Sequence, residues 1–210
     1  MTRTERDAFF RASESVGGTP YALIRTMYET ASRITEVLHL RWKDIDVRSK
    51  SIRVVRIKGS KTVVADITDK LIKALLVHAG SRPRTAGSVV FHGAHRCEER
   101  PRGLIRPRKS GMAWQHCTGG HIERRQVNYW IEKTGRALDL DAGMRHPHVF
   151  KHTRLVDEAR RYKDAGPAAM VAAVRRLSGH ATDTALMVYL DEPEALLERA
   201  KKTREDMEKF

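Results

Sequence analysis

The spacing of apolar side chains predicts that most of this chain is helical. Apolar residues recur every three or four positions through long stretches, the pattern of helices that bury one face. Glycine, proline or short polar residues separate these stretches. Helices are predicted over residues 3–15, 17–42, 69–80, 122–138, 148–165, 167–179, 182–190 and 192–210.

Local signals predict where the first helices begin and break. Thr2 or Thr4 is suited to cap the first helix, because a hydroxyl can accept a bond from a free N–H of the first turn. Thr19 is expected to cap the second helix, with Pro20 at its first position. The apolar spacing changes phase near residues 31–32, so we expect a break there that divides the stretch into a buried helical pair.

One stretch changes from helical spacing to alternation. Residues 51–68 alternate apolar and polar side chains on either side of a turn that carries Lys58 and Lys61, which predicts a β-hairpin. Residues 81–121 are irregular and predict long loops around a short strand at residues 89–91. The expected fold class is therefore mainly α with a small antiparallel β-sheet (α+β).

Charge narrows the range of partners. A net charge of +14, spread over most of 210 residues, favours a polyanionic partner, most often nucleic acid, over a merely soluble basic protein. The charged N-terminus does not resemble a signal peptide, and no run of about 18 apolar residues predicts a membrane span. Only two cysteines are present, which fits a reducing cytoplasm and no disulfide framework.

Six side chains are candidates for chemistry, although each has an ordinary structural explanation. An arginine on a helix is usually solvated, turn lysines are common, and histidines and tyrosines often cap or pack. Their common property is that each could bind, protonate or attack a phosphate. In chain order they are Arg33, Lys58, His148, Lys151, His180 and Tyr189.

The sequence motifs around these residues resemble those of the tyrosine recombinases, the phage-integrase family. "TASRITEVLHLRWKDID" is similar to the family's first motif, and "IKGSK" to its hairpin lysine. "PHVFKHT" resembles the second motif, His-x-Leu-Arg-His-Thr. "LSGHATDTALMVY" resembles the third, in which the nucleophilic tyrosine follows the histidine by nine residues. The resemblance covers roughly residues 4–190, and the third motif is its most specific part.

The resemblance implies a role for each candidate. Tyr189 would attack a DNA phosphate and form a 3′-phosphotyrosyl link, a bond of similar energy to the one it replaces. Arg33, supported by Glu36, and His180 would bind the non-bridging oxygens, where negative charge develops. His148 would assist proton movement at the tyrosine, and Lys58 would protonate the departing 5′-oxygen. No metal or other cofactor is implied.

Two positions depart from the family pattern. Ala31 replaces a usual glycine, a small change, and Lys151 replaces the arginine of the second motif. Lysine keeps the charge but loses the two-pronged geometry of arginine, so activity could be reduced. A second register, which aligns Lys151 and Arg154 with a Lys-x-x-Arg form of the motif, is the less favoured alternative.

Further basic residues are expected to contact DNA, namely Lys61, Arg124, Arg125 and Arg154. Histidines and cysteines gather in two loose clusters within residues 92–121, but their spacing matches no zinc pattern, and a polar loop on or near DNA is the better interpretation. Val127, Trp130 and Ile131 are expected to lie in the core rather than to stack on bases.

The resemblance also predicts domains and partners. Residues 1–192 would form the catalytic domain, and the helix at 193–210 would dock on a neighbouring copy rather than on its own domain. The N-terminal DNA-clamping domain of longer members is expected to be absent. The predicted partner is double-stranded DNA. The protein is expected to form a tetramer on DNA, with a monomer as the possible free form. It is expected to act in the cytoplasm and to be encoded by a bacterium, an archaeon or a phage. The alternatives are DNA relaxation of the type IB topoisomerase kind and a DNA-binding module without activity.

Overall fold

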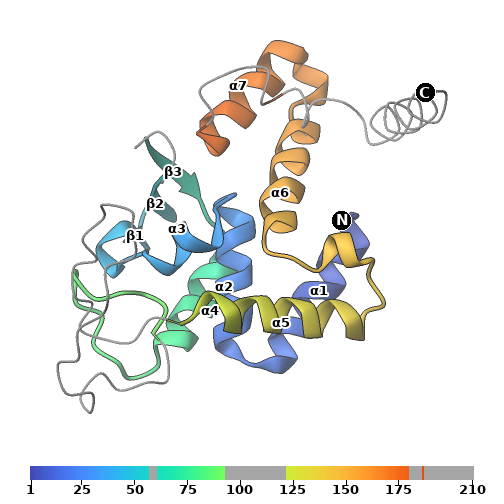
Figure 1. The fold of residues 1–210 in the computed structure, drawn as a ribbon. Coiled ribbons are helices and arrows are strands. Elements are labelled where there is room, and N and C mark those ends of the chain that lie inside the picture. The colour runs from blue at the N-terminus through green and yellow to red at the C-terminus, as the bar shows by residue number, and fades with distance from the viewer. Residues whose placement is uncertain (57–60, 93–121, 180–185, 187–210) are drawn as a thin grey trace, which may run out of the picture.

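The structure is a computed structural model that describes residues 1–56, 61–92, 122–179 and Leu186. Within these ranges most elements are helices, and one small antiparallel sheet lies at the edge of the molecule beside α3 (Ile34–Leu38) and α7 (Pro167–Ser178) (Figure 1). The predicted fold class is therefore confirmed. No helix among these residues is both long and apolar enough to cross a membrane.

The first two helices form where the apolar spacing predicts them. Helix α1 spans Arg3–Val16, and its N-cap is Thr2. The Thr2 hydroxyl accepts a bond from the N–H of Glu5, while the Glu5 carboxylate accepts one from the N–H of Thr2, so each residue satisfies the other's free donor. Helix α2 spans Gly18–Glu29 and packs against α1.

The predicted cap of α2 is wrong. Gly17 occupies the N-cap position, and Pro20 is the third helical residue rather than the first. The hydroxyl of Thr19 lies 2.8 Å from Nδ1 of His78 on another helix, and Nε2 of that histidine lies 2.9 Å from the carbonyl oxygen of Val90. A tertiary hydrogen bond has therefore taken the hydroxyl that the sequence pattern assigned to a local cap.

The small sheet begins after a short helix. Helix α3 spans Ile34–Leu38 and follows the predicted break after α2. Strands β1 (Ile45–Asp46), β2 (Ser51–Val55) and β3 (Thr62–Asp66) pair antiparallel in the order β1-β2-β3. The hairpin is confirmed, whereas β1 was not predicted because two residues carry no periodic signal. The turn at 57–60 lies outside the described residues.

The strand predicted at residues 89–91 is not formed. Val89 makes one isolated bridge to Arg41, and the segment contributes buried side chains without joining the sheet. Its apolar run therefore reflects burial rather than strand pairing. Residues 93–121, which contain every histidine and cysteine of the two clusters except His92, lie outside the described part of the chain.

The remaining helices follow the predicted segments closely, with one exception. Residues 148–165 were predicted as one helix. In the structure the α-helix ends at Arg161, and a separate 3-10 turn follows at Lys163–Ala165. The segments at 182–190, except Leu186, and at 192–210 lie outside the described residues. The remaining elements are η1 (Trp42–Asp44), α4 (Asp69–Ala79), α5 (Arg124–Ala137), η3 (Ala142–Met144), α6 (His148–Arg161), η4 (Lys163–Ala165) and α7 (Pro167–Ser178).

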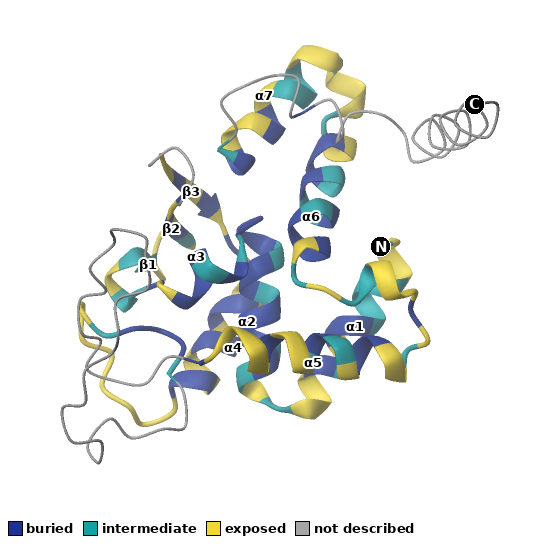
Figure 2. Ribbon diagram, viewed as in Figure 1, coloured by how far each residue is buried: buried dark blue, intermediate teal, exposed yellow. Residues whose placement is uncertain are grey.

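Helix α2 lies at the centre of the main core. It contacts α1, α4 and α6, and its inward side chains are fully buried (Figure 2). The rings of Phe9 and Phe150 meet edge to face at 5.1 Å, so the start of α6 is held beside α1 and α2. Val127 and Ile131 are also in this core, with Trp130 packed against it, as predicted. This packing brings the break after α2 close to the first turn of α6.

A second, smaller core attaches α7. Leu155 and Ala159 of α6 pack with Val174 and Leu177 of α7 and with Ala65 of β3. The C-terminal end of α7 is therefore held beside the sheet and the break after α2. Three segments far apart in the sequence meet in this region.

Candidate active site

Arg33 lies in the break between α2 and α3, where the backbone takes an unusual conformation. Ala31, two residues earlier, has φ of +47°, in the left-handed region that glycine adopts most easily. The family pattern usually has glycine near this point, and the conformation explains why. Arg33 then serves as the N-cap residue of α3, with its side chain partly exposed.

Glu36 fixes the orientation of Arg33. The backbone N–H of Arg33 donates to Oε2 of Glu36 at 2.8 Å, and Nη1 of the guanidinium lies 3.1 Å from Oε1. Burial alone would raise the pKa of Glu36. The hydrogen bond from Arg33 and the charges of Arg56 and Lys151 outweigh burial and lower this pKa below its ordinary value. Glu36 is therefore an ionised carboxylate within the protein, as the support role predicted for it requires.

Arg56 is a charged residue of this site that the sequence interpretation missed. It follows β2 directly, is 1% exposed, and donates from Nη1 to Oε2 of Glu36 at 2.8 Å. In the sequence it continues an alternating strand pattern and looks like a solvated residue beside a turn. The only available signal was its place two residues before Lys58, which specifies no contact.

Lys151 lies in the first turn of α6 and points into the same cluster. It is 2% exposed, and among the described residues its Nζ has no hydrogen-bond partner. Burial, followed by repulsion from Arg56 and Arg33, lowers the pKa of Lys151 to about 8. Glu36 opposes this shift. Arg33, Arg56 and Lys151 thus face one carboxylate, and we call these four residues the Glu36 cluster.

His148 is the first residue of α6 and borders the cluster. Burial, then the positive charges of Lys151 and Arg33, lower the pKa of His148 below its ordinary value. The imidazole is therefore neutral near pH 7 and can both accept and donate a proton. That is the state a proton-transferring residue needs.

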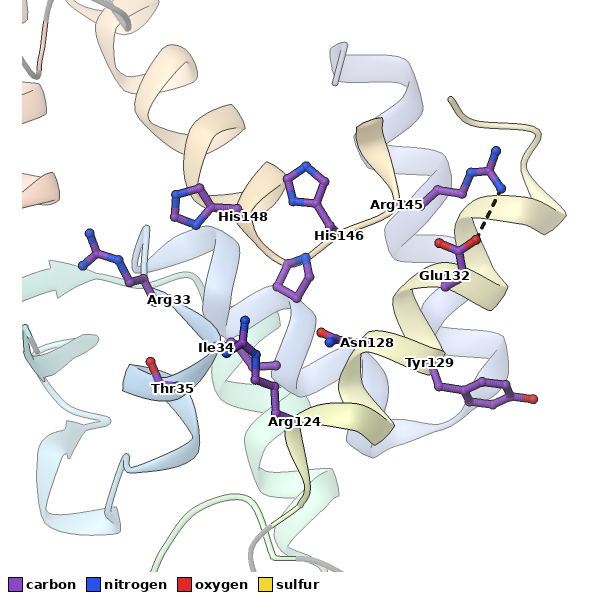
Figure 3. A pocket seen from close by; sticks show the side chains of 11 residues that line it. Arg33, Ile34, Thr35, Arg124, Asn128, Tyr129, Glu132, Arg145, His146 and His148 are labelled. Atoms are coloured by element: carbon purple, nitrogen blue, oxygen red, sulfur yellow. Dashed lines mark hydrogen bonds and ion pairs between the residues drawn. The ribbon is translucent and has the colours of Figure 1, made fainter. Parts of the chain in front are cut away.

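An open pocket of about 770 Å³ joins His148 and Arg33 to α5. Figure 3 shows both side chains on one side of this pocket, with Arg124 and Asn128 of α5 across from them. Arg145 also lines it and is 3.4 Å from the carboxylate of Glu132. The pocket is rich in donors and cations, so it suits an anionic ligand such as a phosphate.

The predicted DNA-contacting residues separate in space. Arg124 lines the pocket, whereas Arg125 is exposed on α5 and Lys61 is exposed before β3. Arg154 is directed to another region, where it pairs with Glu158 at 2.9 Å. It does not line the pocket that contains Arg33, so the Lys-x-x-Arg register brings only Lys151 to this site.

Three of the predicted catalytic residues are not among those that the structure describes. Lys58, His180 and Tyr189 lie outside the described residues. Arg33, Glu36, His148 and Lys151 are brought together, although more than a hundred positions of sequence separate the first pair from the second. Among the described residues no group of three or more histidine, cysteine, aspartate or glutamate side chains could hold a metal ion.

Comparisons with known proteins agree on one family. The model of the phage integrase family matches residues 1–195. Tyrosine recombinase XerD from two strains of Mycobacterium tuberculosis is 24% identical over 168 residues, 80% of this chain and 46% of that protein. The chain therefore spans about half the length of the curated relatives it matches.

Two solved structures have the same fold. The crystal structure of XerA recombinase is 18% identical, with a TM-score of 0.66 over 97% of this chain and 64% of that one. The XerH site-specific recombinase bound to its difH substrate in a pre-cleavage complex is 16% identical. Its TM-score is 0.63 over 96% of this chain and 51% of that one.

Proposed function

This chain belongs to the phage integrase family, and on that premise we propose that it cuts and rejoins double-stranded DNA at specific sites. The supporting observation is the Glu36 cluster: three buried or half-buried cations around one carboxylate, beside an open pocket. One of these cations, the Lys151 ammonium, has no hydrogen-bond partner among the described residues. Such a site lacks an anion, and a phosphodiester supplies one.

The proposed chemistry is a transesterification in which no external energy is used. The phenolic oxygen of Tyr189 attacks the phosphorus, and the bond from phosphorus to the 5′-oxygen breaks. The product is a 3′-phosphotyrosyl link and a free 5′-hydroxyl, whose proton comes from Lys58. Reversal of these steps with a different 5′-hydroxyl joins the strand to a new partner.

The remaining residues bind and balance charge in this proposal. Arg33 has one guanidinium nitrogen on Glu36, and its other nitrogens are available for non-bridging oxygens. Lys151 and His180 bind the same phosphate, and neutral His148 takes up the tyrosine proton. Donors set in advance around a phosphorane lower the barrier, because they need no rearrangement as charge develops.

Assembly and DNA contacts extend the proposal. XerH is bound to a DNA substrate in its solved complex, and the net charge of +14 suits the same class of partner here. Arg124, in the pocket, and the exposed Lys61 and Arg125 would contact the duplex. We propose a tetramer on DNA, in which residues 193–210 dock on a neighbouring copy.

Trapping of the covalent intermediate tests the proposed reaction. The protein is incubated in EDTA with supercoiled plasmids that carry DNA from around its own gene, then denatured in SDS. We expect DNA-linked protein from the wild type and none from Tyr189→Phe. Lys151→Arg run beside them measures whether the lysine limits the rate.

Each other outcome would assign this protein a different function or a different nucleophile. Relaxation of a plasmid without the native DNA, together with an adduct, would indicate topoisomerase-like activity. Intact DNA binding without an adduct, from both wild type and Lys151→Arg, would indicate a binding module. An adduct that survives Tyr189→Phe would assign the nucleophile to another residue.

A further inference from the structure

Arg56 links three segments through a single buried guanidinium. Nη1 donates to Oε2 of Glu36 at 2.8 Å and to Oγ of Ser32 at 2.9 Å, with the carbonyl oxygen of Ala31 at 3.3 Å. Nη2 donates to the carbonyl oxygens of Thr30 at 3.0 Å and Leu177 at 2.6 Å. Three of these acceptors, on Thr30, Ala31 and Ser32, belong to the break before Arg33; Glu36 belongs to α3, and Leu177 to the last turn of α7.

The Leu177 contact occurs where α7 ends. A helix leaves its last carbonyls without internal partners, and Arg56 satisfies one of them with a charged donor. Gly179 then turns the chain with φ of +69°, and a Cβ there would lie 3.1 Å from Cγ of Arg56. The arginine therefore also fixes how closely the chain passes after α7, one residue before the position of His180 in the sequence.

The Glu36 contact determines what Arg33 can do. Arg56 occupies Oε2 of Glu36 together with the Arg33 backbone N–H, which leaves Oε1 for the Arg33 guanidinium. If Arg56 were absent, Glu36 could turn toward Lys151 or toward Arg33 and neutralise the one of these two cations that lines the pocket, Arg33. Arg56 thus fixes the carboxylate in one orientation without reaching the pocket itself, since it is 1% exposed and not among the residues that line it.

We propose that Arg56 is a positioning residue for strand cleavage: it orients Glu36, and through it Arg33, and anchors the end of α7 against the same site. This inference rests on the proposed DNA-cleaving function. It predicts that Arg56 affects the cleavage step and not the binding of DNA, because it acts only through groups that contact the phosphate during the reaction.

The first test compares two arginine-to-lysine substitutions. Arg56→Lys keeps the charge but cannot bridge five acceptors. Arg25→Lys is the matched control, because Arg25 is also largely buried in an ion pair, 2.7 Å from Glu29, and does not line the pocket of Arg33. We expect cleavage by folded Arg56→Lys to fall by about tenfold to a hundredfold, with DNA affinity within about threefold of wild type, whereas Arg25→Lys cleaves at the wild-type rate.

The pH dependence of cleavage provides a readout that loss of stability would not change. The groups that face the Lys151 ammonium from the described elements are Arg56, Arg33, Glu36 and His148. Arg56→Gln removes a neighbouring positive charge, so the pKa of Lys151 rises and the alkaline fall in rate moves to higher pH. Arg56→Lys keeps the charge and leaves the fall where it is.

A milder variant covers the case in which the arginine cannot be replaced. Ser32→Ala removes one acceptor of Arg56 and leaves the other four, and circular dichroism at the assay temperature reports the folded fraction. We expect its cleavage rate to fall by about threefold or more without a change in DNA affinity.

The outcomes separate this inference from the function it rests on. If the wild type forms no adduct dependent on Tyr189, the proposed function fails and this inference with it. If the wild type cleaves and folded Arg56→Lys or Ser32→Ala cleaves at the wild-type rate, only the positioning role is overturned. A rate that falls only in proportion to the folded fraction would overturn it as well.

Discussion

Two groups of charges flank the centre of this molecule, and they are built differently. The Glu36 cluster has three cations for one carboxylate. Around Tyr28 at the end of α2, three arginines and four carboxylates form ion pairs, and we call this group the Tyr28 network. It consists of Arg6, Asp7, Arg25, Tyr28, Glu29, Arg154, Asp157 and Glu158.

The difference shows how a cluster of charges that binds a ligand can be distinguished from one that only stabilises the fold. In the Tyr28 network each arginine meets a carboxylate at hydrogen-bond distance, so little remains for a ligand to satisfy. In the Glu36 cluster the excess positive charge is buried and Lys151 lacks a hydrogen bond within the described chain, which costs folding free energy. A protein retains such a cost most readily where a bound anion removes it.

Removal of one arginine from each group is expected to give the largest difference in cleavage rate between two variants. Arg33→Ala is expected to lower the cleavage rate by about 10²–10³-fold, because it removes a donor to the phosphate during the reaction. Arg25→Ala removes a partner of Glu29 and is expected to lower the melting temperature with an unchanged cleavage rate per folded molecule. Single-turnover cleavage and thermal melting measure the two effects. Equal rate losses in both variants would abolish the distinction.

The low pKa of Lys151 predicts a fall in cleavage at alkaline pH. If the ammonium binds the phosphate, the rate should fall by about tenfold per unit above a pH of about 8, because the neutral amine carries no charge. Lys151→Arg, which stays charged, should keep its rate through this range. Rates from pH 6 to 10 at constant ionic strength provide the measurement. An identical fall in both proteins would assign it to another group.

The same lysine is expected to reduce stability, in contrast to the arginines of the Tyr28 network. Lys151→Met should raise the free energy of unfolding at pH 7 by about 1–3 kcal/mol, since it replaces a buried charge by an apolar side chain of similar length. Because the folded pKa of about 8 lies below the ordinary 10.5, the penalty is fully present below pH 8 and disappears as the pH rises to 10.5. The stabilisation by Lys151→Met should therefore decrease between pH 8 and pH 10.5.

Denaturant unfolding at pH 7 and pH 10 measures this change. Arg25→Met is the control, and it should be destabilised at both pH values because the buried Glu29 carboxylate loses its ion-pair partner. A destabilised Lys151→Met protein at pH 7 would show that the ammonium has a partner beyond the described residues.

The smallest expected effect belongs to the Tyr28 network itself. The hydroxyl of Tyr28 donates to Asp157 at 2.7 Å and accepts from Nη1 of Arg6 at 2.9 Å. Tyr28→Phe should lower the free energy of unfolding by about 1 kcal/mol or slightly more, with cleavage unchanged. Urea titration and the adduct assay together measure this. A cleavage defect would connect the two groups of charges energetically.

The sequence by itself determined most of the described elements and named four candidate residues that lie together in the fold. Helical spacing predicted α1, α4, α5 and α7, because burial of one face leaves a period that neighbouring residues alone reveal. Resemblance to the family's sequence motifs identified Arg33, Glu36, His148 and Lys151, which lie together in the fold. The misplaced cap of α2 and the missing strand at 89–91 are failures of a local pattern against tertiary contacts.

Only the tertiary structure decided which charges are paired. Arg56 looks solvated in the sequence but is buried on Glu36, and Arg154, close to Lys151 in sequence, faces the Tyr28 network instead. Helix rotation and the packing of α6 and α7 on α2 and β3 determine these partners. Electrostatic energy depends on distances between atoms of side chains on different elements, such as Glu36 on α3 and Arg56 after β2, and no spacing along the sequence encodes such distances.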